Sequence, residues 1–227
     1  MVTDLDGTLL DHDTYDWRPA EPAIRALQSR GDTIALCSSK TRAELEVLAR
    51  EIGLDGPLIA ENGASGRGIK FLRAALQSAA KASGAKLRGF GDMNLEEVMR
   101  HTGLGKREAA LAHLREFDEP FLFLEGDKEC FAAAISEAGL QLTRGGRFWH
   151  VLEAGSKGDA LHRLKAGHGL AVALGDSEND RSMLEAADLA IVIPGGNLKP
   201  EPNWRIAPCA GPRGWNEAML ELIAERG

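Results

Sequence analysis

The fold prediction starts from one stretch, Val2-Thr3-Asp4-Leu5-Asp6-Gly7-Thr8-Leu9-Leu10. Its apolar start is typical of a buried strand, and two carboxylates follow directly. If residues 2–5 form a strand of a parallel sheet, Asp4 and Asp6 lie at its carboxyl end, where such sheets bind ligands. Gly7 lets the chain turn sharply away. An acidic turn would explain a bare Asp-x-Asp, but the longer pattern is more specific. It indicates one carboxylate that acts as nucleophile and one that transfers protons, together able to bind a hard cation.

The residues that follow predict further strands of the same sheet. We expect a helix over 21–30, strands over 33–37 and 57–60, and a helix that begins after Thr41. Thr41 and Glu44 have the spacing of a capping box. Ser38 therefore lies between a strand and the start of a helix, where hydroxyl and N–H groups hold phosphate oxygens. The alternative is that Ser38 and Ser39 only cap the helix.

The α/β rhythm resumes near the end of the chain. Ser156-Lys157-Gly158-Asp159 opens a helix, and a strand over 170–174 precedes Gly175-Asp176-Ser177-Glu178-Asn179-Asp180. Lysine in the first turn of a helix is mildly unfavourable beside the positive helix end, which favours an anion near Lys157. The alternative is a solvated charge. We expect a strand over 189–193, a stretch that is mostly loop over 194–212 and a helix over 214–224. Only three residues precede Asp4, so either the first strand is very short or the true start lies upstream.

The middle of the chain has a different pattern. Helices are expected over 71–83, from about Leu95 to near Gly103, over 106–117 and over 128–138. Strands are expected over 86–90 and 121–124. Residues 141–144 and 148–152 flank Gly145-Gly146 and predict a hairpin. This irregular alternation indicates an α+β unit inserted into an α/β core. We therefore predict a Rossmann-like parallel-sheet core over 1–64 and 155–227, with an inserted cap domain over 65–154.

The composition excludes several classes of protein. The 227 residues are 44% hydrophobic and 27% charged, as in an ordinary globular protein. A net charge of −7 argues against a general nucleic-acid binder, because no basic surplus can neutralise phosphates. The three cysteines show no CxxC spacing and indicate reduced thiols. We find no transmembrane run and no signal peptide, so a cytoplasmic monomer or homodimer is expected, without nucleic-acid or membrane partners.

Four pieces at the ends of successive predicted strands resemble the four motifs of the haloacid dehalogenase superfamily. They are Asp4/Asp6, Ser38, Lys157 and the stretch from Asp176 to Asp180. The insert is similar to the α+β cap of the superfamily's sugar-phosphatase branch. Further stretches resemble the mannosyl-3-phosphoglycerate phosphatase family over nearly the whole chain. These stretches are 11–15, 37–42, 61–64, 89–93, 102–104, 144–150 and 175–180. The segment from Gly66 to Phe71, where the core enters the cap, is shorter than the family pattern, which bears on the substrate.

The resemblance implies a mechanism. Asp4 would attack phosphorus and become an aspartyl phosphate, while Asp6 would act as general acid and then as general base. Ser38 and Lys157 would bind the phosphoryl oxygens. Mg²⁺ would be held by Asp4, the backbone carbonyl of Asp6 and Asp176. Asn179 and Asp180 would act through water or from behind the direct ligands.

The implied reaction is hydrolysis of mannosyl-3-phosphoglycerate, a small phosphorylated glycoside, to mannosylglycerate and phosphate. Alternatives are a phosphatase of glucosyl-3-phosphoglycerate or another sugar phosphate, a phosphotransferase or mutase, and a non-catalytic binding module. The presence of all of Asp4, Asp6, Ser38, Lys157 and Asp176 argues against the last class.

Residues of the cap should choose the substrate. Arg144 and Arg147 can clamp a carboxylate in forked geometry, and His150 could contact a sugar. The alternatives are a solvated hairpin for the arginine pair and a structural role for His150. Four more residues are expected near the site by their position in the chain: Lys40, Arg42, Glu61 and Asn62.

Overall fold

The chain forms two compact units. A computed structural model describes residues 1–144, 147–166 and 169–226. The core unit comprises Met1–Ser38, Val47–Gly63 and Ser156–Gly227, and the insert unit comprises Ser39–Glu46 and Ala64–Gly155. In the described part of the chain, no helix is both long and apolar enough to cross a membrane.

Parallel strands form the sheet of the core unit, in the order β10-β9-β8-β1-β2-β3. Their bounds are β1 Val2–Thr3, β2 Ala35–Cys37, β3 Leu58–Ile59, β8 Val172–Gly175, β9 Leu189–Val192 and β10 Arg205–Ile206. β1 lies in the middle, where Thr3 pairs with Leu36 on one side and Leu174 on the other. The ladder continues for one more bond, because the Asp4 N–H donates to the Leu174 carbonyl at 2.9 Å. Asp4 therefore stands at the carboxyl end of the central strand, as the first motif predicts.

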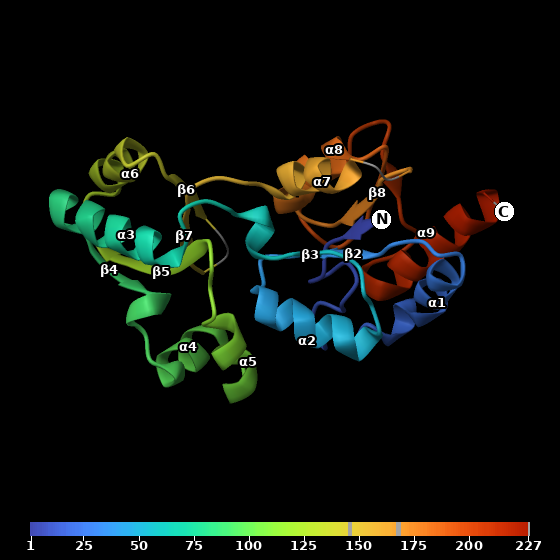
Figure 1. Ribbon diagram of the computed structural model, residues 1–227, viewed down its shortest axis with the longest axis horizontal. Helices are drawn as coiled ribbons and strands as arrows, with labels where there is room; N and C mark the ends of the chain where they lie inside the picture. The colour runs from blue at the N-terminus through green and yellow to red at the C-terminus, as the bar shows by residue number, and fades with distance from the viewer. Residues whose placement is uncertain (145–146, 167–168, 227) are drawn as a thin grey trace. The chain divides into compact units, whose positions relative to one another are not determined.

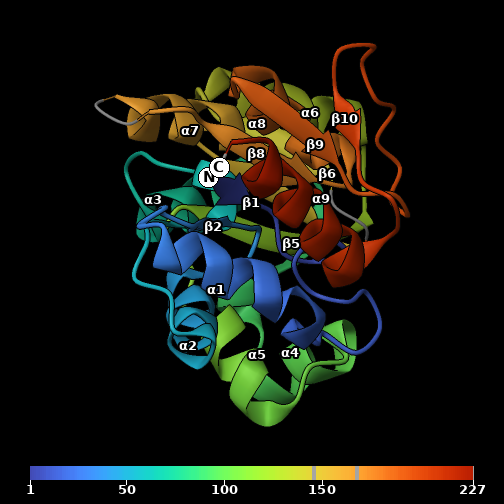
Figure 2. The same ribbon diagram turned by 90° about the vertical axis from the view of Figure 1, so that its right-hand side faces the viewer.

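Helices cover both faces of this sheet. Their bounds are α1 Glu21–Ser29, α2 Arg42–Ile52, α7 Lys157–Lys165, α8 Arg181–Ala186 and α9 Gly211–Glu225. α7 and α8 lie on one face, and α1, α2 and α9 lie on the other (Figures 1 and 2). Apolar side chains of α7 and α8 pack against the sheet strands in one buried cluster. The predicted parallel α/β core is confirmed.

Local capping predictions also hold at the starts of α2 and α7. The Glu44 N–H donates to Thr41 Oγ1, and Glu44 Oε2 accepts the Thr41 N–H at 2.7 Å, which is the predicted capping box. At the start of α7, the Asp159 N–H donates to Ser156 Oγ at 3.0 Å. Ser38 lies just before α2, and its carbonyl and N–H continue the ladder between β2 and β3.

An antiparallel sheet in the order β4-β5-β7-β6 forms the insert unit. The bounds are β4 Lys86–Gly89, β5 Asp118–Glu125, β6 Gln141–Arg144, β7 Trp149–Leu152, α3 Ile69–Ser83, α4 Leu95–Thr102, α5 Lys106–Ala112 and α6 Lys128–Glu137. Side chains of α3 and α6 pack against Phe121 and Val151 of the sheet. The predicted antiparallel pairing is confirmed, with Arg144 opposite Trp149. The expected Gly145-Gly146 turn lies outside the described residues.

Several predicted boundaries were wrong. The helix expected over 106–117 ends at Ala112, and β5 begins at Asp118 rather than at residue 121. The longer strand buries Asp118 and Glu119, which sequence alone favours at a surface, because both find cationic partners. The loop expected over 194–212 contains the short strand β10, and α9 begins at Gly211, with Pro212 in its first turn. Proline suits the first turn of a helix, because an N–H group at that position would have no acceptor within the helix.

Candidate active site

A buried lysine joins two motifs at the carboxyl ends of the core strands. Lys157 is 2% exposed, and its Nζ lies 2.6 Å from Asp4 Oδ1 and 2.6 Å from Asp180 Oδ1. Lys157 is the first residue of α7, where the Ser156 cap fixes the direction in which the helix starts. The anion expected beside this lysine is thus a pair of carboxylates, and the solvated alternative is wrong.

Asp180 organises the loop after β8. Its side chain is fully buried, and Oδ2 accepts the N–H groups of Asp176 and Ser177 at 3.1 and 3.0 Å and the Ser177 hydroxyl at 3.0 Å. Since Oδ1 pairs with Lys157, both oxygens of Asp180 have partners inside the protein. Asp180 therefore holds the loop and the lysine in place.

Two glycines let the chain approach the Asp176 carboxylate closely. A Cβ atom on Gly7 would lie 2.7 Å from Asp176 Oδ2, and one on Gly196 would lie 2.5 Å from the same atom. Gly7 also has a φ of +79°, which favours glycine. The role of Gly7 follows from the first motif. Gly196 was missed, because it lies in a stretch where Gly and Pro indicate only a loop.

The buried carboxylates at this site outnumber the cations that contact them. Burial, with smaller effects from Asp180 and Asp6, raises the pKa of Asp4 to about 7 against the lowering effect of Lys157. Burial and the charge of Asp180 raise the pKa of Asp176 to about 6. Burial alone would lower the pKa of Lys157, but the two neighbouring carboxylates outweigh it and raise that pKa. The carboxylates therefore ionise at a cost that an additional cation would remove.

This arrangement fits a hard divalent cation. Asp4, Asp176 and Asp180 each offer one oxygen atom, and these atoms lie within 4.8 Å of one another. The donors are all oxygen, as Mg²⁺ prefers, and one lysine offsets three carboxylates. Because Asp180 is engaged on both oxygens, Asp4 and Asp176 are the better direct ligands. The surplus negative charge is the physical reason for a cation here.

The two strands β2 and β3 bring three other predicted residues, Ser38, Glu61 and Asn62, to the same edge. Ser38 is 1% exposed, and its carbonyl accepts the Asn62 N–H at 2.8 Å. The Asn62 Oδ1 atom accepts a hydrogen bond from Asn179 Nδ2 at 3.0 Å. Glu61 is buried beside it, and Asp6 lies half-buried in the turn after β1. The core-unit residues named from the sequence thus gather at one edge of the sheet.

The five remaining predicted residues belong to the insert unit. Arg42 pairs with Glu116 at 3.5 Å, and Lys40 is half-buried. Arg144 stacks over Trp149 at 5.0 Å, and Arg147 is exposed. His150 Nδ1 lies 2.8 Å from Asp118 Oδ2, and Arg115 pairs with the same carboxylate. The Arg115–Asp118–His150 group was not predicted from the sequence. The i, i+3 spacing of Arg115 and Asp118 was the signal that the sequence offered.

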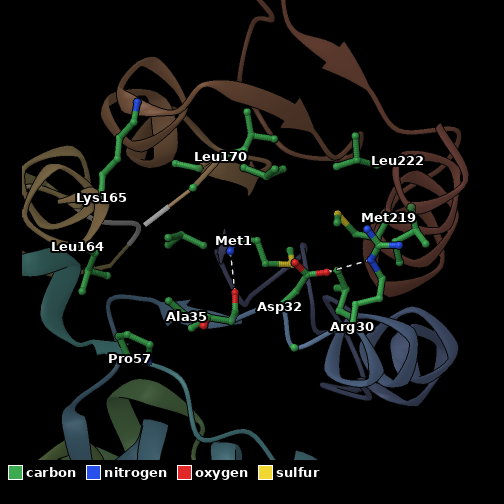
Figure 3. A pocket seen from close by; sticks show the side chains of 18 of the residues that line it. Met1, Arg30, Asp32, Ala35, Pro57, Leu164, Lys165, Leu170, Met219 and Leu222 are labelled. Atoms are coloured by element: carbon green, nitrogen blue, oxygen red, sulfur yellow. Dashed lines mark hydrogen bonds and ion pairs between the residues drawn. The ribbon is translucent and has the colours of Figure 1, made fainter. Parts of the chain in front are cut away.

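A cavity lies at the other end of the core sheet. It has a volume of about 420 Å³ and is lined by the amino ends of β1, β2 and β8 and by α1, α7 and α9. Met1 projects into it, and its amino group donates to the Thr33 carbonyl at 2.6 Å (Figure 3). None of the predicted motif residues lines this cavity. The chemistry-bearing groups gather at the carboxyl ends, so we place the candidate active site there.

Comparison with known proteins agrees with this geometry. A family model described as haloacid dehalogenase-like hydrolase matches residues 1–68. The chain belongs to the haloacid dehalogenase-like hydrolases, and within them it is a phosphoric monoester hydrolase. A relative from Methanococcoides burtonii, named glucosyl-3-phosphoglycerate/mannosyl-3-phosphoglycerate phosphatase, is 37% identical over 99% of this chain and 97% of its own length. A relative of the same name from Persephonella marina is 34% identical, with the same shares covered.

Solved structures agree on the fold. A phosphatase of this superfamily from Bacteroides thetaiotaomicron has a TM-score of 0.71 at 18% identity, covering 98% of this chain and 93% of that one. A subclass IIB sugar phosphatase has a TM-score of 0.67 at 16% identity, covering 99% and 98%. The predicted core with an inserted α+β unit is the fold of these proteins.

Proposed function

We propose that this protein hydrolyses mannosyl-3-phosphoglycerate to mannosylglycerate and phosphate. The observation that carries the proposal is the buried Asp4 carboxylate, held by Lys157 Nζ at 2.6 Å at the carboxyl end of the central strand. A carboxylate in that position can act as a nucleophile toward a phosphate ester. The names of the two curated relatives supply the substrate class.

In the first step, an Asp4 carboxylate oxygen bonds to phosphorus as the bond from phosphorus to the ester oxygen breaks. Asp6 donates a proton to the departing oxygen of the glycerate. Lysine has three donors, of which Asp4 and Asp180 use two, so the third N–H of Lys157 can donate to a phosphoryl oxygen. The Ser38 hydroxyl is the proposed second donor, at the start of the loop before α2. The product is an aspartyl phosphate.

In the second step, water bonds to phosphorus and the bond between the Asp4 oxygen and phosphorus breaks. Asp6, now a carboxylate, takes the proton from the water. Inorganic phosphate leaves, and both aspartates return to their starting states. The two carboxylates have different tasks because Asp4 is buried against Lys157, whereas Asp6 lies half-buried in the following turn.

The proposed cofactor is Mg²⁺. Asp4 and Asp176 would hold it, with the backbone carbonyl of Asp6, while Asn179 and Asp180 would act through water or from behind the direct ligands. When bound, it offsets the repulsion between the carboxylate nucleophile and the phosphate dianion. Stripping the protein with a chelator should abolish turnover, and Mg²⁺ should restore it. Full activity of the metal-free protein would contradict the site.

The insert unit is proposed to select the substrate. Arg144 and Arg147 are the candidates for the glycerate carboxylate, and His150 for the sugar. Lys40, Arg42, Glu61 and Asn62 remain predicted substrate contacts. Glucosyl-3-phosphoglycerate is a second candidate substrate, because the names of both relatives include it.

A phosphate-release screen tests the function. The panel contains mannosyl- and glucosyl-3-phosphoglycerate, free 3-phosphoglycerate and hexose phosphates, each assayed with and without an added sugar acceptor. We expect the glycosyl phosphoglycerates to have the highest kcat/KM. Hexose phosphates that outrank them would overturn the substrate. Phosphate transferred to the acceptor without net release would indicate a phosphotransferase instead.

A further inference from the structure

The turn Glu61-Asn62-Gly63 touches three of the four motif segments of the core unit. The Asn62 N–H donates to the Ser38 carbonyl at 2.8 Å, and Asn62 Oδ1 accepts from Asn179 Nδ2 at 3.0 Å. A Cβ atom on Gly63 would lie 2.5 Å from the Ser156 carbonyl oxygen, next to Lys157. One short turn after β3 thus links the segment that contains Ser38, the loop after β8 and the start of α7.

The backbone of this turn is strained. Glu61 has a φ of +51° and Asn62 a φ of +57°, both in the left-handed region. Asparagine tolerates this conformation, but glutamate adopts it at a cost. Consecutive left-handed residues persist when their surroundings determine the conformation, and such strain gathers at functional sites. Glu61 is 2% exposed, so its side chain is held inside the unit.

We propose that Asn62 is a positioning residue, which sets the Asn179 amide for the cation and ties that loop to the Ser38 segment. This inference rests on the Mg²⁺ dependence in the proposed function. Only the oxygen of an amide can bind a cation or its water. Because Nδ2 of Asn179 donates to Asn62, the rotation of the amide is fixed, and Oδ1 points away from this hydrogen bond within the amide plane. Partners of this kind orient the groups around a metal.

A binding measurement can separate this role from the direct substrate contact predicted for Asn62. Asn62 Oδ1 already accepts a hydrogen bond from Asn179, and the backbone N–H of Asn62 donates to the Ser38 carbonyl. A residue that contacts substrate should alter KM for substrate at saturating Mg²⁺. A residue that acts through Asn179 should alter Mg²⁺ affinity in the absence of substrate.

The test is Mg²⁺ binding to the full metal-free chain, measured by isothermal titration calorimetry. Asn62→Gly removes the side chain but keeps the left-handed backbone and the N–H to Ser38, whereas Asn62→Ala adds backbone strain. Asn203→Gly is the matched control, since Asn203 is exposed in a turn of the same unit. We expect Asn62→Gly to raise the Mg²⁺ Kd about tenfold and Asn203→Gly to leave it unchanged. Circular dichroism and Tm establish that each variant folds.

A double variant shows whether Asn62 acts through Asn179. If it does, adding Asn179→Ala to Asn62→Gly should raise the Mg²⁺ Kd no further than Asn179→Ala alone. Unchanged Mg²⁺ affinity in folded Asn62→Gly overturns the proposal, and so do additive effects. A wild-type protein that releases phosphate but does not bind Mg²⁺ also overturns it. A protein whose Mg²⁺ affinity depends on Asn62 but which hydrolyses none of the panel supports this inference and contradicts the proposed function.

Discussion

Both units bury carboxylates, but the units differ in how these carboxylates share their cationic partners. In the insert unit, Asp118 pairs with Arg115 and with His150, and Glu119 pairs with Arg73 at 3.0 Å. In the core unit, Asp4 and Asp180 share Lys157. The ion pairs of the insert unit neutralise its buried carboxylates. The carboxylates around Lys157 in the core unit retain negative charge that a ligand can offset.

The pKa shifts follow this difference. Burial would raise the pKa of Asp118, but Arg115 and His150 outweigh it and hold that pKa below its ordinary value. Glu119 is intermediate, because burial raises its pKa despite Arg73. The pKa of Asp4 is raised to about 7, although Lys157 contacts this carboxylate. A buried acid with a raised pKa and too few cationic partners is therefore the better marker of a reactive site.

The largest expected effect is on activity, from Asp4→Asn. It should lower kcat by at least about a thousandfold, because an amide cannot replace the carboxylate nucleophile. The fold should remain, since Lys157 keeps its bond to Asp180. Phosphate release and circular dichroism measure both, with the exposed Asp55→Asn as control. Activity within tenfold of wild type would remove Asp4 from the mechanism.

The opposite outcome is expected for Asp118→Ala in the insert unit. Loss of this carboxylate leaves Arg115 buried without its partner and should cost roughly 3–5 kcal/mol of unfolding free energy. Glu125→Ala is the matched control on the same strand, because its pair with Lys86 is exposed and contributes at most about 1 kcal/mol. Urea unfolding followed by circular dichroism gives both values. Equal losses in the two variants would contradict the structural role of the buried pair.

Gly196→Ala tests how closely the Asp176 carboxylate must be held. The added methyl would lie 2.2 Å from the Asp176 carbonyl oxygen, so the loop must move. We expect kcat/KM to fall about a hundredfold, as misplaced catalytic groups do. The control is Gly169→Ala, where a Cβ atom meets nothing within 4 Å. Kinetics within twofold of wild type would show that the loop adapts.

Arg147→Ala tests an exposed charge of the insert unit. If Arg147 binds the glycerate carboxylate, loss of a charged hydrogen bond costs about 1.5–3 kcal/mol and lowers kcat/KM for glycosyl phosphoglycerates roughly tenfold to a hundredfold. Cleavage of an aryl phosphate should change little. Arg107→Ala, also exposed in this unit, is the control. A similar loss on both substrates would mean that the carboxylate is bound elsewhere.

The smallest effect is on pH dependence in metal-free protein. Between the ordinary value of 3.8 and about 7, folded Asp4 binds more protons than unfolded Asp4, so stability falls as pH rises. The pKa of Asp176 is also raised, so this carboxyl should contribute to the same fall in stability up to about pH 6. Urea unfolding from pH 4 to pH 8 measures the pH dependence of the free energy of unfolding. Asp4→Asn should make this dependence weaker. Stability that rises over this range would contradict the raised pKa values.

Much of the fold was predictable because its signals are local. The Thr41–Glu44 capping box and the strand pairing around Arg144 depend on residues a few positions apart. The end of α5 was not predictable in this way. A helical pattern continued beyond Ala112, but Asp118 and Glu119 joined a strand because Arg73 and His150 reach them from distant elements.

The sequence by itself predicted which residues would carry the chemistry and determined in what order they lie at the ends of strands. Short motifs encode that information, because strand ends, tight turns and helix caps depend on neighbouring residues. Only the tertiary structure decided how the charges are shared. Lys157 lies 153 positions from Asp4, and no local pattern shows that one lysine serves both Asp4 and Asp180. The imbalance that favours a cation arises when distant residues are buried together, because burial makes each unpaired charge costly.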